Sequence, residues 1–185
     1  MSIIKKEIRR IIRAKKKEID SSKRDVLSES LLDILKNNPL YQISKNIFIF
    51  WSMDDEIDTR KFIVDNAHAK NFYLPAIVGE NELELRLFKG MDDLKPGMEF
   101  NILEPVGKKL DDLALVDLAI IPGIAFDRER GRMGRGRGFY DRILKSLSND
   151  CKKIGICYSL QIVDHVPMDE HDVYMDLIIT DAEVI

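Results

Sequence analysis

The most constraining feature of this sequence is an apolar run that leads into a glycine- and arginine-rich segment. The run at 116–122 is followed by RERGRMGRGRGFYDR at residues 128–142, and then by the apolar-periodic residues Ile143, Leu144 and Leu147. A short continuous apolar run is typical of a strand buried on both faces, and the periodic residues are typical of a helix. We therefore predict a strand, a long glycine-rich loop and a helix, in that order.

Strand and helix patterns alternate along the rest of the chain. We expect further strands at 47–51, 71–75, 83–87, 153–158 and 176–180, and helices at 2–19, 22–37 and 58–69. The strand at 83–87 alternates leucines with charges, as a half-exposed antiparallel strand does. The segment 89–112 is expected to be irregular apart from a short strand at 100–103. The alternation predicts an α/β fold: a three-layer sandwich with a central, mostly parallel, Rossmann-like sheet.

The first two helices carry local signals of their own. The segment 2–19 places isoleucines on one face and a basic stripe beside them, the stripe being Lys5, Arg9, Arg13 and Lys16. The stripe is either an ordinary solvated face or a surface that reaches an anion. Ser22 and Asp25 have the spacing of a capping box for the second helix, which Asn37-Asn38-Pro39 should end.

Length and composition restrict the class of protein. At 185 residues a single domain over 1–185 is expected, and a net charge of −3 argues against a general nucleic-acid binder. The basic N-terminus lacks the apolar core of a signal peptide, and no run is long enough to cross a membrane. Cys151 and Cys157 have no metal-like spacing, so apolar packing is expected for them. We expect a cytoplasmic monomer that binds a small anionic ligand rather than nucleic acid or a membrane.

The glycine-rich segment has the properties of a phosphate-binding loop. Glycines let the backbone approach an anion, helix N-termini favour negative charge, and arginines bind phosphate through two parallel hydrogen bonds. Asp141 in the first turn of the following helix is suited to Mg²⁺, which takes one or two carboxylates plus phosphate oxygens. A flexible basic loop is the alternative. The spacing fits neither the P-loop nor the dinucleotide-binding motif, because Phe139 occupies the third glycine position of the latter.

Two residues near the end of the apolar run 47–51 are further candidates. Trp51 ends the run, and Glu56 follows it within a polar turn. Ligands of open α/β sheets bind outside the carboxyl ends of the strands, so both residues are expected near the ligand. Core packing for Trp51 and a helix-start carboxylate for Glu56 are the alternatives.

The sequence FDRERGRMGRGRGFYDR at 126–142 resembles the signature loop of the 5-formyltetrahydrofolate cyclo-ligase family, also called methenyltetrahydrofolate synthetases. The resemblance extends over essentially the whole chain. Matching pieces are Lys5-x-x-Ile8-Arg9, Glu56-x-x-Thr59, Leu103-Glu104-Pro105, Ile121-Pro122-Gly123, Gln161, Pro167, His171-Asp172, Asp176 and Thr180. Phe139 departs from the family pattern, where tyrosine is common, and Trp51 stands where smaller apolar residues also occur.

The resemblance implies an ATP-dependent enzyme that closes 5-formyltetrahydrofolate, with or without a polyglutamate tail, to 5,10-methenyltetrahydrofolate. It implies ATP contacts from Lys5, Arg9, Arg132, Met133, Gly134, Arg135, Gly136, Arg137, Gly138, Phe139 and Tyr140. It implies folate contacts from Trp51, Glu56, Arg135, Gly136, Arg137, Gly138 and Phe139, and a weaker one from Phe100. The implied catalytic residues are Arg135, Tyr140 and Glu56, and the implied Mg²⁺ ligands are Asp141 and Asp172. A non-catalytic nucleotide- or RNA-binding module is the alternative function.

Overall fold

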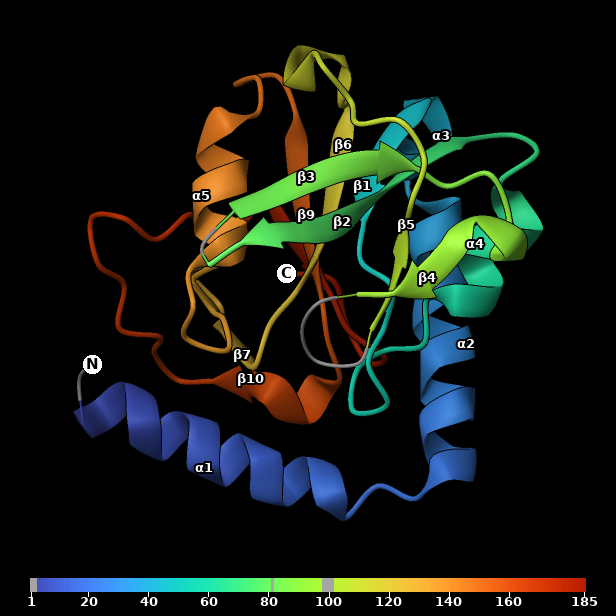
Figure 1. Cartoon of the computed structure of the whole chain (residues 1–185). Helices are drawn as coiled ribbons and strands as arrows, with labels where there is room; N and C mark the ends of the chain where they lie inside the picture. Colours follow the sequence, from blue (N-terminus) through green and yellow to red (C-terminus); the bar gives the residue numbers. More distant parts are fainter. Residues whose placement is uncertain (1–2, 81, 98–101) are drawn as a thin grey trace.

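The computed structural model describes residues 3–80, 82–97 and 102–185, and it is built around a six-stranded sheet (Figure 1). The strand order is β11-β9-β6-β1-β2-β3, and every pairing in this sheet is parallel except that of the edge strand β3 with β2. The strands are β1 (Asn46–Ile49), β2 (Asn71–Gly79), β3 (Glu82–Leu87), β6 (Leu118–Pro122), β9 (Lys152–Ile156) and β11 (Leu177–Ile179). The predicted mostly parallel sheet is confirmed.

Helices cover both faces of this sheet and make the predicted three layers. The helices α2 (Ser21–Asn37), α3 (Pro39–Ile43) and α4 (Arg60–Asn66) lie on one side, and α5 (Phe139–Ser146) lies on the other (Figure 1). Successive strand residues point to opposite faces. In β1, Ile47 and Ile49 join the core under α2 to α4, whereas Phe48 joins the core under α5. Both faces are therefore buried, which explains the unbroken apolar runs.

Smaller elements lie within segments that the sequence presented as loops. A three-stranded sheet is formed by β10 (Ile162–Val163), β7 (Ala125–Asp127) and β8 (Arg132–Met133). β7 directly precedes the glycine-rich segment, and β8 lies within it. The segment expected to be irregular contains the short hairpin of β4 (Leu94–Pro96) and β5 (Leu103–Pro105), which corrects that prediction. The expected strand at 100–103 falls largely outside the described residues. Single-turn 3₁₀ helices are η1 (Met91–Asp93), η2 (Leu113–Leu115) and η3 (Ser159–Gln161).

The helix boundaries follow the sequence signals only in part. α2 ends at Asn37 as predicted, but its N-cap is Asp20, whose carboxylate accepts a hydrogen bond from the Lys23 N–H at 2.8 Å. The expected capping box of Ser22 and Asp25 is thus wrong, because the chain enters the helix two residues earlier. The Asn38 side chain then caps the short helix α3, which the sequence analysis did not predict.

The N-terminal helix α1 (Ile3–Lys17) buries cationic side chains as well as an apolar one. It lies below the sheet, beside β7 and β10 (Figure 1). Its buried residues are Arg9, Ile12 and Lys16, whereas Ile4 and Ile11 are exposed. Ile8 packs against the same small apolar cluster as Ile12, and Ile19 just after the helix is buried as well. The isoleucine face is therefore turned inward in part, and Arg9 and Lys16 are buried beside it. Within the described ranges, no helix is long and apolar enough to cross a membrane.

Candidate active site

A cavity of about 120 Å³ opens where β1 and β6 end and the glycine-rich segment begins. Its apolar wall includes Trp51, Pro75, Ile77 and Leu83, the last two from the strands β2 and β3. Ten of the residues proposed from the sequence line it: Trp51, Glu56, Arg132, Gly134, Arg135, Arg137, Gly138, Phe139, Tyr140 and Asp141. The topology explains this grouping, because parallel strands bring their carboxyl ends to one edge of the sheet.

Arg132 is the most firmly held cation of the cavity. It is only 3% exposed, and it donates from Nη1 to the Pro122 carbonyl at 3.2 Å and from Nη2 to Asp141 Oδ1 at 2.7 Å. Its guanidinium lies over the Tyr140 ring, 5.7 Å from the ring centre. Its buried Nε–H has no hydrogen-bond partner. An unsatisfied buried donor is costly, so this group is suited to a ligand oxygen.

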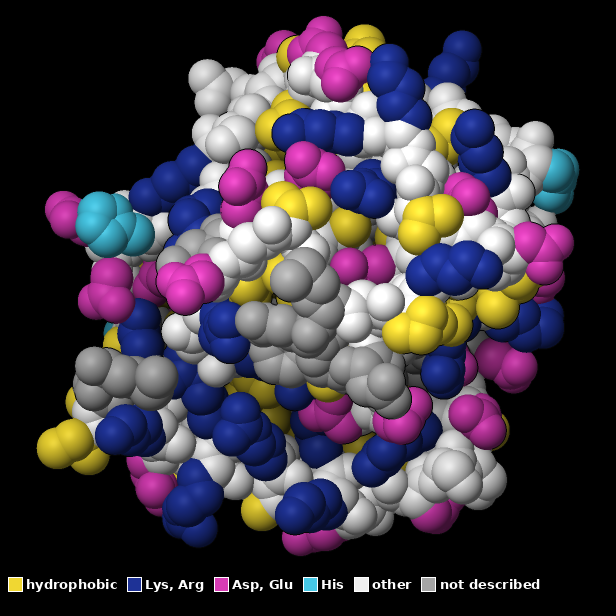
Figure 2. Space-filling model, in the orientation of Figure 1, with side chains coloured by type: hydrophobic (Ala, Val, Ile, Leu, Met, Phe, Trp, Pro, Cys, Tyr) yellow, Lys and Arg dark blue, Asp and Glu magenta, His cyan; other side chains and the backbone are white. Residues whose placement is uncertain are grey.

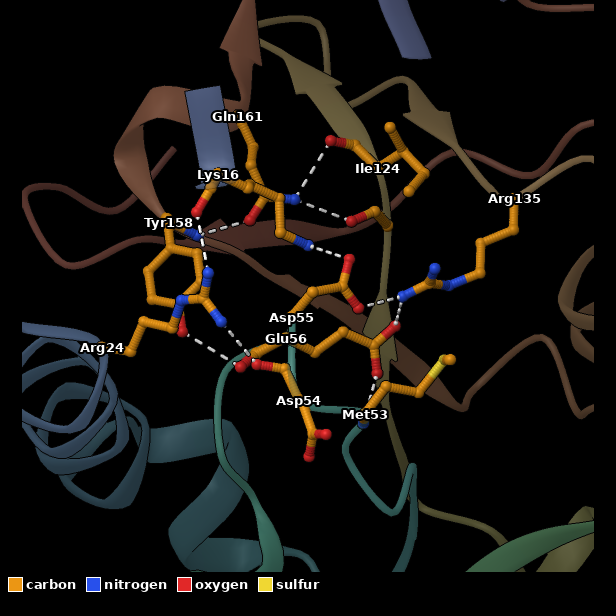
Figure 3. Close-up of polar contacts among 11 residues, drawn as sticks. Lys16, Arg24, Met53, Asp54, Asp55, Glu56, Ile124, Arg135, Tyr158 and Gln161 are labelled. Carbon is orange, nitrogen blue, oxygen red and sulfur yellow. Dashed lines mark hydrogen bonds and ion pairs between the residues drawn. The ribbon is translucent and has the colours of Figure 1, made fainter. Parts of the chain in front are cut away.

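Arg135 belongs to a separate charged network at the edge of the cavity (Figure 3). Its Nη2 lies 2.6 Å from Asp55 Oδ1 and 3.0 Å from Glu56 Oε1. The other oxygen of Asp55 accepts a hydrogen bond from the ammonium of buried Lys16 at 2.9 Å. Two cations thus alternate with two carboxylates. The cations come from the helix α1 and the glycine-rich loop, and both carboxylates come from the turn after β1.

The backbone and side chain of Glu56 are both fixed. Oε2 of its carboxylate accepts the Met53 N–H at 3.0 Å, and its backbone carbonyl accepts the Tyr158 hydroxyl at 3.0 Å (Figure 3). Gln161 in turn accepts the Tyr158 N–H and donates to the carbonyls of Gly123 and Ile124. Glu56 is therefore tied to the end of β6 and presents its carboxylate in one orientation.

Tyr140 and Phe139 begin α5 directly behind the loop. The Tyr140 ring stacks on Phe48 at 5.9 Å between ring centres and with 7° between the planes. Burial, with a smaller contribution from Glu56, raises the pKa of the Tyr140 phenol far above its usual value. Tyr140 therefore stays protonated and can donate a hydrogen bond but cannot serve as a base. Phe139 lies under the guanidinium groups of Arg137 and Arg142.

The cations of α1 approach the loop from below, where Figure 2 shows Lys and Arg side chains gathered over this helix. Arg9 donates from Nε to the Gly134 carbonyl at 3.0 Å. Lys5 pairs with Asp169 at 2.6 Å and with Asp172 at 2.8 Å. Burial lowers the pKa of Lys5, but these two hydrogen-bonded carboxylates outweigh it and raise the pKa above its usual value. Lys5, Arg9 and Asp172 thus border the loop without lining the cavity.

The expected Mg²⁺ ligands are Asp141 and Asp172. A contact between Asp141 and the residue after Asp172 brings them near one another. The Val173 N–H, next to Asp172, lies 3.4 Å from Asp141 Oδ1. With respect to the residues that the structure describes, Asp141 makes its hydrogen bonds through Oδ1 and Asp172 through Oδ2, so one oxygen of each carboxylate remains for a metal ion. No group of three or more His, Cys, Asp or Glu side chains within the described ranges is arranged to hold a metal alone. The pair fits Mg²⁺ that takes its other ligands from phosphate and water.

Some residues fall outside these groupings. Met133 packs with Ile12 of α1 in a small apolar cluster, and Gly136 is exposed in the loop without lining the cavity. Phe100 lies outside the described residues. Asp55 was not among the site residues proposed from the sequence, and Lys16 was named only as part of the basic stripe of the first helix. The sequence signals were this stripe and the position of Asp55 next to Glu56; the pairing of Asp55 with Lys16 itself spans 39 residues.

Comparisons with known proteins agree with one another. A model of the 5-formyltetrahydrofolate cyclo-ligase family matches residues 2–181. The 5-formyltetrahydrofolate cyclo-ligase of Mus musculus is 32% identical over 148 residues, covering 74% of this chain and 73% of the mouse protein. That of Haemophilus influenzae is 33% identical over 135 residues, covering 70% and 72%. The solved structure of Aquifex aeolicus 5,10-methenyltetrahydrofolate synthetase superposes with a TM-score of 0.88 at 32% identity, covering 98% of this chain and 92% of that one. The chain therefore belongs to the 5-formyltetrahydrofolate cyclo-ligase family.

Proposed function

We propose that this protein converts 5-formyltetrahydrofolate to 5,10-methenyltetrahydrofolate and uses ATP, which leaves as ADP and phosphate. The observation that carries the proposal is the cavity at the ends of β1 and β6, in a chain of this family. It combines an apolar wall for a flat ring system with arginines for phosphate and an oriented carboxylate, that of Glu56. A small-molecule substrate with an aromatic and an anionic part fits such a lining.

The chemistry requires that a poor leaving group be activated. The formyl oxygen attacks the γ-phosphorus of ATP, and the bond from that phosphorus to the ADP oxygen breaks. The folate N10 then attacks the formyl carbon, the phosphorylated oxygen leaves as phosphate, and the N10 proton is lost to solvent. This route needs no covalent enzyme intermediate, so the protein's tasks are to align the reactants and to neutralise charge.

The residues of the cavity suit these tasks. We expect Arg132 and Arg135 to bind phosphate oxygens, with Lys5, Arg9 and the loop 132–140 around the nucleotide. Protonated Tyr140 would donate a hydrogen bond to the transferred group. Glu56 would hold the pterin against the wall formed by Trp51 and stabilise the cationic intermediate. Mg²⁺, which neutralises phosphate charge when bound, would be held by Asp141 and Asp172.

An RNA-binding module is the weaker alternative. The Arg/Gly segment is neither repetitive nor a tail: it contains the strand β8, the start of α5 and a buried arginine. Segments that bind single strands through such residues usually lie in extended, solvated chains.

A single domain over residues 1–185 and a monomeric state remain predictions. Size-exclusion chromatography with light scattering would check the monomeric state.

The test of the function is a spectroscopic assay. The purified protein is incubated with 5-formyltetrahydrofolate and MgATP, and the near-ultraviolet absorbance of the methenyl product is followed. We expect a signal that requires ATP and is proportional to enzyme concentration. No ATP-dependent signal from protein with a cooperative melting transition would refute the proposal.

A further inference from the structure

Lys16 is a buried cation whose position needs an explanation. It lies on α1 with 3% of its surface exposed, and its ammonium contacts Asp55 Oδ2 at 2.9 Å. Burying an ammonium group costs free energy unless it is paired, and burial here lowers the pKa of Lys16 in spite of the opposing effect of Asp55. The position of Asp55 is therefore set by a side chain of the N-terminal helix.

Asp55 joins that cation to the loop. Its Oδ2 faces Lys16, and its Oδ1 faces Arg135 at 2.6 Å (Figure 3). Burial raises the pKa of Asp55, but the two cations outweigh burial and hold the pKa below its usual value. Asp55 is thus ionised at neutral pH and presents a fixed negative charge to Arg135.

The loop itself does little to fix the Arg135 side chain. Arg135 lies between Gly134 and Gly136, and Gly136 has a φ of 110°, which only glycine adopts readily. In the described part of the chain, the polar partners of the Arg135 guanidinium are Asp55 and Glu56. Under the proposed function, the Glu56 carboxylate contacts the substrate. Asp55 is therefore the carboxylate that can hold Arg135 throughout the reaction.

We propose that Asp55, held in place by Lys16, is a positioning residue that fixes the Arg135 guanidinium beside Glu56, where it meets the phosphoryl group in transfer. This inference rests on the proposed function. It also makes α1 a support of the reacting centre and not merely a source of nucleotide contacts.

The first experiment compares two neighbouring carboxylates. Asp55→Asn keeps the shape of the side chain and removes its charge, and Asp54→Asn is the matched control because the Asp54 side chain is 98% exposed. Misplacing a catalytic group by about 1 Å can cost about 100-fold in rate. We expect Asp55→Asn to lower kcat/KM about 10- to 100-fold, mainly through kcat. Asp54→Asn should keep the wild-type rate.

Substrate binding gives a readout that does not depend on turnover. Trp51 is the single tryptophan of the sequence, and it lines the cavity. Titration of its fluorescence with 5-formyltetrahydrofolate should give the same affinity for Asp55→Asn as for the wild type, since the apolar wall is untouched. The loss would then lie in the alignment of the reactants and not in folate binding.

A double-mutant cycle with Arg135→Gln tests whether Asp55 acts through Arg135. If it does, Asp55→Asn adds no further loss to the Arg135→Gln variant. Lys16→Met is the second variant. It should lower kcat in the same direction. Because removing one partner of a buried ion pair also costs stability, kcat is compared at a temperature at which both the variant and the wild type are fully folded.

Several results would overturn the inference. It fails if Asp55→Asn and Asp54→Asn have the same kcat, or if the Asp55→Asn loss is undiminished in the Arg135→Gln background. It also fails if Asp55→Asn and Lys16→Met lose activity only in proportion to a lower melting temperature. A wild-type protein without ATP-dependent turnover would refute the proposed function itself and this inference with it, so the two failures are distinguishable.

Discussion

The proposed chemistry requires a negative charge at Glu56. Its oxygens accept from Met53 N–H and Arg135, and its side chain is 11% exposed. Glu56→Gln keeps the shape and removes the negative charge opposite the cationic intermediate. We expect kcat/KM to fall about 30- to 1,000-fold, as for removal of one oriented electrostatic contact of about 2–4 kcal/mol. The methenyl absorbance assay measures this.

Stability controls for Glu56→Gln follow from the same contacts. The amide has one oxygen, so it keeps either the Met53 or the Arg135 hydrogen bond, and the Tyr158 contact is to the backbone. Arg135 retains Asp55 as a partner, so the decrease in melting temperature should be modest. Unchanged kcat/KM in a folded variant would remove Glu56 from the mechanism.

Asp141 carries a structural role beside its proposed metal role. From the sequence, a residue at a helix start near the surface would be replaceable without loss of the fold. In the structure its side chain is 16% exposed and pairs with Arg132, whose side chain is 2% exposed. Asp141→Ala leaves a buried cation without its carboxylate, which typically costs about 3–5 kcal/mol. We expect a large decrease in the free energy of unfolding, measured by chemical denaturation.

Asp141→Asn separates the two roles of this residue. Its amide oxygen can still accept from Arg132, so the stability loss should be clearly smaller than for Asp141→Ala. It is nevertheless a poorer ligand for Mg²⁺, and turnover should fall with a rightward shift of the Mg²⁺ dependence. Equal stability losses for the two variants would contradict this account of the Arg132 pair.

At the scale of the element, the start of α5 depends on one backbone conformation. The N-cap Gly138 has a φ of 68°, and a Cβ there would lie 3.0 Å from Arg142 Nη1. A left-handed conformation costs about 1–2 kcal/mol for a residue with a Cβ. Gly138→Ala should lower the free energy of unfolding by about that amount in a urea titration. Gly79→Ala, whose added Cβ would lie 3.9 Å from Glu82 Cβ, should be nearly neutral.

The elements that the sequence predicts are those decided by local apolar pattern. From Ile47 onward β1 is a continuous apolar run, and so is β6, because both faces of these strands are buried. β9 begins with two lysines and is buried only from Ile154 onward. The hairpin of β4 and β5 is not predictable in this way. Its strands are three residues long and end in proline, so no period can be read from them.

The buried side of α1 shows a second reason why a sequence-based prediction can be incomplete. An isoleucine stripe predicts an apolar contact face, and Ile8 and Ile12 do pack in an apolar cluster. The helix also rests, however, on the Gly134 carbonyl and the carboxylates of Asp55 and Asp172. This long-range pairing explains why Asp55 was not predicted as part of the site and why Lys16 was named only as part of a basic stripe. The residues of the glycine-rich loop were predictable because they are contiguous, whereas their supports come from distant segments.

At the scale of the whole molecule, the free energy of unfolding should decrease as the solution becomes acidic. The pKa of Asp172 is held below its usual value: burial raises it, but the hydrogen bond from Lys5 and further contacts outweigh burial. Asp55 behaves in the same way. A carboxylate with a lowered folded-state pKa contributes stability that is full above the unfolded-state pKa and is lost as pH falls through the folded-state pKa.

The free energy of unfolding should therefore decrease from about pH 5 downward and continue to decrease below about pH 3.9. Denaturant titrations at a series of pH values measure this profile. Asp172→Asn removes one of the responsible groups, so its profile should be flatter than that of the wild type over the same range. A parallel profile would show that Asp172 does not contribute to the acid sensitivity.

The docking of α1 also has a consequence for how the protein is made. Lys5 and Asp172 are 167 residues apart, and Arg9 and Gly134 are 125 apart. During synthesis this helix emerges well before the loops that receive its charged side chains, and contacts of such sequence separation form slowly. Two of the three buried residues of α1, Arg9 and Lys16, are cations that water can solvate until those loops have been made. We therefore expect the newly made helix to expose less apolar surface than a helix with a wholly apolar contact face would.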